Sequence, residues 1–502
     1  MIASMPNPLL LLNLPDEVLI TIFSFLDFKT LRNATLVSRL FGDLGEPFLY
    51  HSIKILNGQQ AAALSAALYA NPRRATWVRS LLVSTKFGED EGLNILPPHI
   101  GRMRNLQDLC LETPDCNAKF PEERVDWVNL QDRYERIFES ASAVVPKEDR
   151  VLPNLRSCTL HFVDGTKEIY SMTKYAMLFL HPNLRSLTMS CASTDYPDRL
   201  LLPFQNDKAL IKSTNLEYLH LEECDIFEPS LAILLSFPKA LKSLKVSEGI
   251  RYDGIFSARS SRMHGNVNPG YFVDALAVHC IDSLEYLSLS LGHLRQGFQN
   301  INHAGQHLDL TPFHALKQLE LDVRTVNLVR IRVQCDHATS RRLPPNLETL
   351  KIFGIPLGER PPFQARRRVW FPFGTCIVTE KARHGLRHLK NLVYSYEYYR
   401  EDDEIPRRSI SDDGESVEEI SQVSLAHQRM IEKCNELQPL YRRANVRLEI
   451  EMVALPNGFI PPYLFPEDKP RHFKLWESAP KSRDNAMLFA VPENTCDYNP
   501  GC

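Results

Sequence analysis

The sequence predicts an α/β protein in which a short segment of three helices precedes a solenoid of repeated strand–helix units. Two observations support this fold class. Residues 13–41 carry apolar side chains at helical spacing, and the residues after them repeat the phrase Leu-x-x-Leu-x-Leu. Composition agrees, because 44% hydrophobic and 24% charged residues are typical of a globular chain. At 502 residues, the chain is several times longer than one domain of about 100–200 residues.

The N-terminal segment is expected to contain three helices. Pro15 suits the first position of a helix, and apolar residues at helical spacing follow it. Asp27 and Thr30 offer a polar break and an N-cap for a second short helix, and a third helix is expected from about Ser38 to Tyr50. The first helix is apolar nearly all round, so it must be buried nearly all round. Three short helices cannot achieve this alone, so the segment needs the rest of the chain or another protein.

On spacing alone, an ordinary helical cap on a larger fold explains this segment equally well. The ordered residues nevertheless resemble the F-box family, in the pattern Leu14-Pro15-x-Glu17-x-Leu19-x-x-Ile22-x-x-x-Leu26, then Leu31, then Val37-Ser38-Arg39-x-Phe41. The resemblance implies docking onto the Skp-family adaptor of a cullin–RING ubiquitin ligase. The adaptor contacts that it implies are Leu14, Pro15, Leu19, Ile22, Leu26, Val37 and Phe41. The pattern does not say which apolar face is core and which is interface.

The phrase Leu-x-x-Leu-x-Leu recurs along the middle of the chain. Its last two Leu positions alternate with polar residues, which indicates strands, and apolar helical stretches lie between copies. The spacing of middle positions, such as Leu187 to Leu219, is near or just above the roughly 20–29 residues of leucine-rich repeats. Many copies are preceded by an Asn. The copies begin at Val78, Leu106, Leu155, Leu184, Leu216, Leu241, Leu284, Leu316 and Leu347, and a last copy near Leu386–Tyr394 is ambiguous in register.

One strand and one helix cannot bury their apolar sides alone, so neighbouring units must stack. The recurrence therefore favours a leucine-rich-repeat solenoid over the alternative, a generic α/β domain with a parallel sheet. Longer gaps, such as that between Leu109 and Cys158, predict irregular insertions. Most copies lack the later Asn/Cys-x-Leu step of these repeats, which leaves the repeat class and the curvature open.

The F-box resemblance, the repeated phrase and the composition together set the expected domain boundaries. We predict an F-box domain at 1–55, the solenoid at 56–400, and a closing helix–strand unit with a C-terminal tail at 422–502. Between the last two, 401–421 is polar and acidic without apolar periodicity, which predicts a disordered insertion. The closing unit is expected to begin with a helix over 424–443. The apolar positions of its strand are Val446, Leu448, Ile450 and Met452.

In a stacked array, the strands form the concave face, and the residues at phrase positions 4 and 6 point into the core. Positions 3, 5 and 7 therefore point outward along that face. We expect this small, polar surface to bind a protein substrate, with tyrosines as anchors, because Tyr is enriched at interface hot spots. The candidate substrate-binding residues are Tyr218, His220, Lys245, Tyr286, Glu320 and Lys351. The alternative is binding by insertions near 250–270 or 358–368.

Charge and motif content argue against several other classes. Lys+Arg is 58 and Asp+Glu is 61, and a formal net charge of -3 gives no reason to bind nucleic acid or an anionic membrane. We expect no signal peptide and no membrane-spanning helix. The 11 cysteines include no Cys-x-x-Cys pair and are expected to be free thiols in the cytoplasm or nucleus. No nucleophile-elbow, phosphate-loop, dinucleotide or zinc-protease motif occurs, so we expect no catalytic residue, metal or cofactor.

These patterns and the resemblance together predict a non-catalytic, substrate-recognition subunit of an SCF-type ubiquitin ligase. The F-box would bind the Skp-family adaptor, and through it the cullin and RING subunits. The repeats would bind an unknown protein to be ubiquitylated. Two alternatives stay open: an adaptor-bound scaffold without a role in ubiquitylation, and an enzyme whose site forms across repeats.

Overall fold

The computed structural model describes residues 14–85, 89, 91–113, 116, 127–162, 170–194, 207–224, 226, 228–247, 269–290, 309–322, 325, 343–356, 386–400, 432, 434–456 and 461–478. The chain divides into two compact units along its length. Unit 1 comprises Met1–Pro114, Val128–Thr159 and Glu493–Cys502, and unit 2 comprises Asp115–Trp127 and Leu160–Pro492. The boundaries expected from composition stay predictions, and the expected acidic insertion at 401–421 lies outside the described residues.

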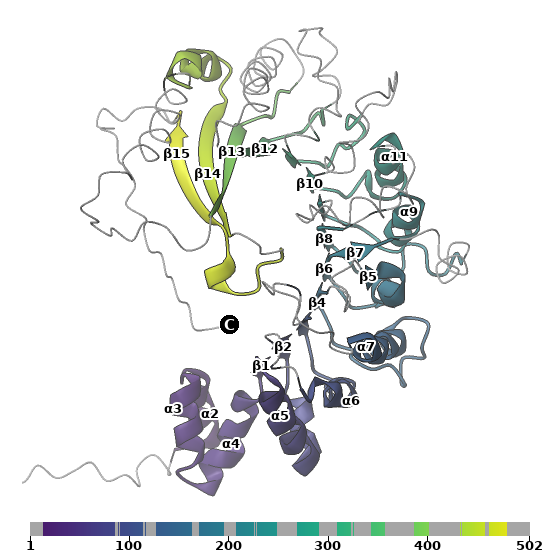
Figure 1. Ribbon diagram of the computed structural model, residues 1–502, viewed down its shortest axis with the longest axis vertical. Helices are drawn as coiled ribbons and strands as arrows, with labels where there is room; N and C mark the ends of the chain where they lie inside the picture. The colour runs from purple at the N-terminus through teal and green to yellow at the C-terminus, as the bar shows by residue number, and fades with distance from the viewer. Residues whose placement is uncertain are drawn as a thin grey trace, which may run out of the picture. The chain divides into compact units, whose positions relative to one another are not determined.

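The described N-terminal residues form the three expected helices. They are α2 (Asp16–Ser24), α3 (Phe28–Thr35) and α4 (Arg39–Leu49) (Figure 1). The Asp27 side chain caps α3 by accepting a hydrogen bond from the Thr30 N–H at 3.0 Å. Ser38 caps α4 in the same way, accepting from the Phe41 N–H at 3.1 Å. The polar break read from the sequence is therefore a true helix boundary, and the prediction of an N-terminal helical region is confirmed.

The rest of unit 1 alternates strands and helical segments. Its first three strands pair in parallel, in the order β1-β2-β3. They are β1 (Ser52–Ile55), β2 (Ser80–Ser84) and β3 (Asp108–Glu112). The helical segments that follow β1 along the chain are α5 (Gly58–Ala70), η1 (Pro72–Thr76), η2 (Leu93–Ile95), α6 (Pro97–Ile100) and α7 (Trp127–Ala141). The strand β4 (Ser157–His161) contains the boundary between the two units.

Unit 2 contains a large sheet whose described strands follow the order β6-β8-β9-β10-β11-β12-β13-β14-β15. Every neighbouring pair in that series is parallel except β14 and β15, which are antiparallel. The strands are β6 (Ser186–Ser190), β8 (Tyr218–Glu222), β9 (Ser243–Ser247), β10 (Tyr286–Ser290), β11 (Gln318–Asp322), β12 (Thr349–Pro356), β13 (Asn391–Arg400), β14 (Arg447–Pro456) and β15 (Arg471–Glu477). The chain is therefore a mixed α/β protein with a large parallel sheet, and the predicted α/β fold class is confirmed.

Helical segments and short elements separate these strands along the chain. The described ones are a small parallel pair, β5 (Tyr170–Ser171) with β7 (Ala192–Ser193), and η3 (Met172–Leu180), α9 (Glu228–Ser236), α11 (Pro269–Cys280) and η6 (Pro466–Asp468). The helices α9 and α11 pack against each other, and Figure 1 shows them on the same side of the strands. Parallel strands require such crossover connections, because a tight turn cannot return the chain to the same end of the sheet.

The phrase Leu-x-x-Leu-x-Leu coincides with the strands. Its fourth residues lie in one register across unit 2, and they are fully buried: Leu187, Leu219, Leu244, Leu287, Leu319, Leu350 and Leu392. Leu448 of β14, which does not carry the phrase, continues this register and is also buried. The pairing of Leu350 with Leu392 also settles the ambiguous last copy, which begins at Leu389 and ends at Tyr394. The prediction that positions 4 and 6 face the core is confirmed for these strands. The finer assignment to a leucine-rich-repeat solenoid stays a prediction.

The Asn before many copies has a structural role that repeats along the chain. The Asn105 side-chain amide donates to the Thr76 carbonyl at 2.6 Å, and Asn215 donates to the Pro182 carbonyl at 2.7 Å. Asn154 and Asn346 make equivalent bonds, so each of these amides reaches back to the preceding copy. Such a bond satisfies a loop carbonyl that no strand or helix would pair.

The C-terminal described residues differ in one respect from the prediction. The helical residues 434–443 and the strand β14 agree with the expected closing helix and strand. However, β14 is not the last strand, because β15 follows and pairs with it in antiparallel orientation. The part of the tail from Arg471 to Glu477 therefore joins the sheet. The phrase Leu-x-x-Leu-x-Leu is absent from it, which is why the sequence did not reveal this strand.

Candidate protein-interaction surfaces

The helices α2, α3 and α4 enclose a small apolar core. Its buried members are Leu19, Phe23, Leu31 and Phe41. The rings of Phe23 and Phe41 meet edge to face, with centroids 5.3 Å apart. One apolar residue or two from each helix thus fixes the arrangement of all three.

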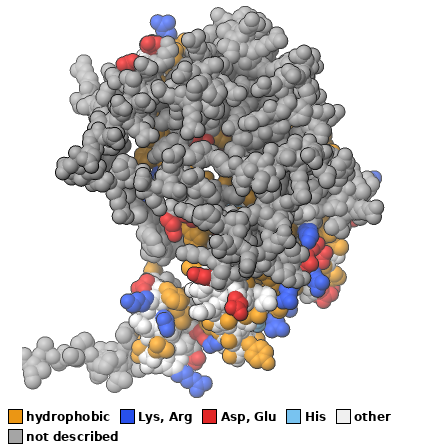
Figure 2. Space-filling model, in the orientation of Figure 1, with side chains coloured by type: hydrophobic (Ala, Val, Ile, Leu, Met, Phe, Trp, Pro, Cys, Tyr) orange, Lys and Arg blue, Asp and Glu red, His pale blue; other side chains and the backbone are white. Residues whose placement is uncertain are grey.

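The same helices leave large apolar side chains exposed. Phe25 is 84% exposed, Leu36 79%, Val37 70% and Phe28 65%. Figure 2 shows hydrophobic side chains among charged ones on this part of the chain. We call the following seven residues the helical apolar surface: Val18, Ile20, Ile22, Phe25, Phe28, Leu36 and Val37. Single exposed apolar residues are ordinary, but a group within one short segment indicates an interaction site.

The structure divides the seven residues implied as adaptor contacts into three groups. Pro15, Ile22 and Val37 are exposed. Leu14 and Leu26 are partly buried against the helical core, and Leu19 and Phe41 lie inside it. Leu19 and Phe41 therefore support the surface from beneath. Contact between the exposed members and an adaptor stays a prediction.

Arg74 ties α4 to the residues that follow it in unit 1. Its guanidinium donates to the Glu46 carboxylate, with Nε 2.7 Å from Oε1, and to the Ala67 carbonyl at 2.9 Å. It also lies over the Tyr50 ring, 5.3 Å from the centroid. The Arg74 and Glu46 side chains are only 23% and 25% exposed, so solvent and salt screen their attraction weakly. This contact, hereafter the Arg74 latch, fixes α4 on the segment after it.

These three helices fall in the stretch that matches a known family. The model of the F-box-like family matches residues 11–55. The chain carries an F-box-like domain. No curated protein matches the chain. F-box domains generally bind Skp-family adaptors, and the helical apolar surface belongs to this domain.

The second surface lies outside the F-box-like domain, on the sheet of unit 2. The strand register places Tyr218, Ser243, Tyr286 and Gln318 side by side. The next row contains His220, Lys245, Ser288 and Glu320. We call positions 3, 5 and 7 of β8–β11 the central sheet face: Tyr218, His220, Glu222, Ser243, Lys245, Ser247, Tyr286, Ser288, Ser290, Gln318, Glu320 and Asp322.

An ion pair lies within the central sheet face. Lys245 Nζ is 2.8 Å from Glu222 Oε1, and the two side chains are 35% and 6% exposed. Burial is the largest single influence and lowers the pKa of Lys245, but the carboxylates of Glu222, Glu320 and Glu223 together outweigh it, and the pKa lies above its usual value. Lys245 therefore carries its charge at neutral pH. Burial lowers the pKa of His220; Glu222 opposes this shift and Lys245 adds to it, so His220 is neutral at pH 7.

A second polar cluster lies on β10 and β11. The Ser288 hydroxyl donates to Glu320 Oε2 at 3.5 Å, and the Tyr286 hydroxyl also bonds to Glu320. Burial raises the pKa of Tyr286, and the negative charge of Glu320 raises it further, so the phenol stays protonated and donates. Tyr218 is 43% exposed on the same face. An aromatic ring and a carboxylate thus lie together at partly exposed positions.

The structure brings five of the six candidate substrate-binding residues together on the described strands β8–β11. They are Tyr218, His220, Lys245, Tyr286 and Glu320. Lys351 pairs in register with Glu320 on the adjacent strand β12, but its ammonium forms an ion pair with Glu451 of β14. Lys351 is thus directed away from the cluster. Substrate binding by any of these residues stays a prediction, and the alternative insertions near 250–270 and 358–368 lie outside the described residues.

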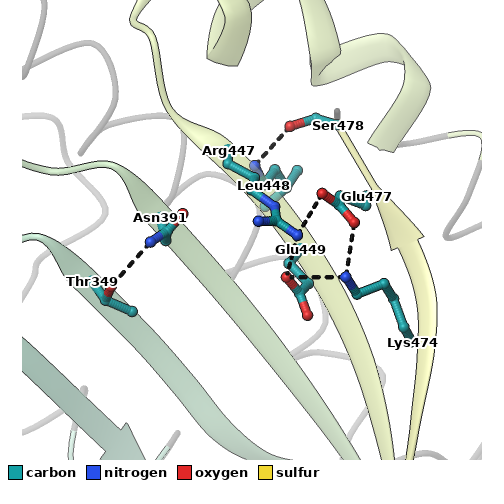
Figure 3. Close-up of polar contacts among 8 residues, drawn as sticks. All are labelled: Thr349, Asn391, Arg447, Leu448, Glu449, Lys474, Glu477 and Ser478. Carbon is teal, nitrogen blue, oxygen red and sulfur yellow. Dashed lines mark hydrogen bonds and ion pairs between the residues drawn. The ribbon is translucent and has the colours of Figure 1, made fainter. Parts of the chain in front are cut away.

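The end of the sheet at β14 and β15 has a balanced charge network (Figure 3). Arg447 lies between Glu449 and Glu477, at 3.5 and 2.5 Å, and Lys474 lies between the same two carboxylates, at 3.7 and 2.8 Å. The Ser478 hydroxyl accepts a hydrogen bond from the Leu448 N–H at 2.8 Å at this end. Two cations thus neutralise two anions, which makes this end a structural contact between strands.

A charge ladder that the sequence analysis did not find runs along phrase position 2. Its members alternate in sign: Arg185, Glu217, Lys242, Glu285, Lys317, Glu348 and Lys390. Three ion pairs join neighbouring copies, Lys242 with Glu217 at 3.1 Å, Lys317 with Glu285 at 3.4 Å, and Lys390 with Glu348 at 2.7 Å. Aligning the copies by phrase position would have shown the alternation in the sequence.

Three further features bear on function. Among the residues that the structure describes, no group of three His, Cys, Asp or Glu side chains is arranged to hold a metal ion. No helix in the same residues is long and apolar enough to cross a membrane. The seven described cysteines are free thiols, and burial raises the pKa of those at Cys110 and Cys434 to about 12, so they are protonated and unreactive.

Proposed function

We propose that this chain is a non-catalytic, substrate-recruiting subunit of an SCF-type ubiquitin ligase in the cytoplasm or nucleus. The F-box-like domain docks on a Skp-family adaptor, and through it on the cullin and RING subunits. The observation that carries the proposal is the match at residues 11–55, on helices whose large apolar side chains are exposed. A surface with Phe25 and Leu36 about four-fifths exposed is stabilised when another protein covers it.

The same proposal assigns the strand–helix copies to a leucine-rich-repeat solenoid that binds the substrate. The buried, in-register fourth positions and the repeated Asn side-chain bonds support this assignment. A further repeated feature supports it: the Glu217 carbonyl accepts from the Lys242 and Ser243 N–H groups, and the carbonyl at the same position of the next copies does likewise. Copies that stack by the same contacts form one continuous array.

Adaptor binding tests the first half of the proposal. We would measure the dissociation constant of the full chain for a purified Skp-family adaptor by calorimetry. Changing Leu36→Asp and Val37→Asp together should weaken binding at least about 30-fold, because hot-spot contacts are worth ≥2 kcal/mol each. Both residues are exposed, so the folded state should be unaffected.

The matched control for this test is Tyr69→Asp. Tyr69 is 82% exposed, also in unit 1, but lies outside the F-box-like domain. We expect its adaptor affinity to equal that of the unchanged chain. Full-strength binding by the folded Leu36/Val37 variant would contradict docking through this surface.

Substrate recruitment tests the second half. Proteins stabilised in cells by the Leu36/Val37 variant, but not by the Tyr69 variant, are the expected substrates. A reconstituted ligase containing the chain should ubiquitylate them, and the reaction should stop with the Leu36/Val37 variant. Adaptor binding without any such substrate would favour the scaffold alternative.

A further inference from the structure

The central sheet face carries an excess of negative charge. Its twelve described positions include three carboxylates, Glu222, Glu320 and Asp322, and one cation, Lys245. The other basic side chain on the face, His220, is neutral at pH 7. Lys245 attracts both neighbouring acids but forms its short contact with Glu222. The excess of negative charge therefore lies on the β10–β11 side of the face.

This excess is specific to the centre of the sheet. At β14 and β15, Arg447 and Lys474 each bridge the same two carboxylates, and charge is balanced (Figure 3). On β10 and β11, the groups bonded to Glu320 are the hydroxyls of Ser288 and Tyr286, which bring no positive charge. A carboxylate held by hydroxyls keeps its full charge and still attracts a cation from outside.

The neighbours of Glu320 are suited to a cationic side chain. Tyr286 lies on the adjacent strand and offers an aromatic ring, whose face attracts cations. Gln318 pairs in register with Tyr286 and is exposed, so its amide oxygen offers a further acceptor. Arg and Lys bind such combinations of carboxylate, ring and neutral acceptor, and anionic groups are repelled by them.

We propose that the central sheet face binds its partner protein through an arginine or lysine side chain, which pairs with Glu320 beside the Tyr286 ring. The proposal rests on the proposed function, because it names the chemistry of the substrate that the repeats recruit. It excludes recognition of a phosphorylated or acidic segment at this face. Lys245 forms its short contact with Glu222, and Lys351, in register with Glu320 on β12, forms its ion pair with Glu451. Both neighbouring ammonium groups therefore have another carboxylate as their ion-pair partner.

Peptide arrays test this chemistry without a known substrate. The purified full chain is applied to random peptides with a fixed central arginine, and to matched sets in which citrulline or glutamate replaces it. Citrulline keeps the shape of arginine but removes its charge. We expect at least about tenfold more chain on the arginine set than on either other set, with the difference falling between 50 and 300 mM salt because exposed charge pairs are screened.

Two variants locate the binding to Glu320. Glu320→Gln keeps the size of the side chain and its acceptor for the Tyr286 hydroxyl, and it should remove most of the preference for arginine. Gln318→Lys places a positive charge at an exposed neighbour and should have the same effect without disturbing the core. The control is Glu348→Gln, which removes the same charge from an exposed pair with Lys390 outside the face.

Equal binding to the three peptide sets, preference for the glutamate set, or an unchanged preference in folded Gln318→Lys would overturn the inference. Adaptor affinity is measured on the same preparations, so the two proposals fail separately. An arginine preference without adaptor binding would refute the proposed function and keep the peptide site. Adaptor binding without an arginine preference would refute the peptide site and leave the proposed function standing.

Discussion

The F-box-like domain and the central sheet face present opposite chemistry to solvent. The first exposes Phe25, Phe28 and Leu36, whose affinity for another surface comes from removing apolar area from water. The second is polar and only partly exposed: Tyr218 is 43% exposed, whereas Ser243, Ser288, Glu222 and Asp322 are buried. Ser288 with Glu320 and Lys245 with Glu222 form polar contacts within it. Apolar burial suits one constant partner, whereas placed charges discriminate among many. Under the proposed function, the first surface would supply affinity for the ligase assembly and the second would select the partner.

The largest expected effect concerns the core beneath the helical apolar surface. Phe23→Ala should destabilise the three helices by about 3–5 kcal/mol, because Phe23 is buried and contacts Phe41. Phe25→Ala, at an exposed position two residues later, should change stability by no more than about 0.5 kcal/mol but weaken adaptor binding. Chemical denaturation and calorimetry would measure both. Equal losses of stability would show that Phe25 packs in the core and would end the distinction between core and surface.

The Arg74 latch should give the next largest effect. Arg74→Met should destabilise unit 1 by about 1–3 kcal/mol, because it leaves the partly buried Glu46 without its cation. A double-mutant cycle with Glu46→Gln would isolate the pair, and the double variant should recover part of the loss. If the two changes proved additive, the contact between α4 and η1 would be held by packing rather than by this pair.

Acidification should destabilise the sheet of unit 2 through His220. The pKa of His220 is lowered in the folded state, so the unfolded state binds more protons as pH falls below about 6.5. The stability associated with neutral His220 is therefore complete above that pH and is lost as pH falls through the folded pKa. His220→Gln should flatten the decline between pH 7 and 5 in the free energy of unfolding. An unchanged slope would mean that His220 does not titrate between these values.

The smallest effect should come from the charge ladder. Lys317→Gln should cost less than about 1 kcal/mol, because Lys317 and Glu285 are 55% and 50% exposed and surface pairs contribute little. The cost should vanish in 1 M salt, where the screening length is about 3 Å. A cost that persisted in salt would point to packing of the lysine stem instead of charge.

Much of the fold could be predicted, because its elements repeat a simple pattern. The alternation of Leu219 and Leu221 with Tyr218 and His220 predicts both the strand and the side on which its leucines are buried, and the structure agrees. By contrast, α5 has small Ala residues and no strong apolar stripe, so its helix was not predicted. The sequence did not reveal β15 either, because its partner β14 is needed to recognise it.

The candidate sites were harder to predict than the fold. Spacing could not separate Leu19, which is buried, from Ile22, which is exposed, because both fall on apolar stripes of one helix. Phe25 and Phe28 are not among the adaptor contacts that the resemblance implies, although they are among the most exposed apolar residues described. The strand position of Lys351 places it in the candidate site, but its ion pair with Glu451 depends on a strand far along the chain. The local sequence determines the side of the sheet on which a side chain lies, whereas its ion-pair partner depends on distant segments.

The alternating charge ladder restricts how this protein can change length over evolution. Each ladder residue has opposite-sign neighbours on the adjacent copies, as Lys242 has in Glu217 and Glu285. Loss of the single copy that carries Lys242 would bring Glu217 next to Glu285, two like charges at neighbouring positions. Loss of two successive copies would restore an attractive pair, Glu217 beside Lys317. Because each exposed pair contributes little, the ladder gives only a weak bias toward the gain and loss of copies in even numbers.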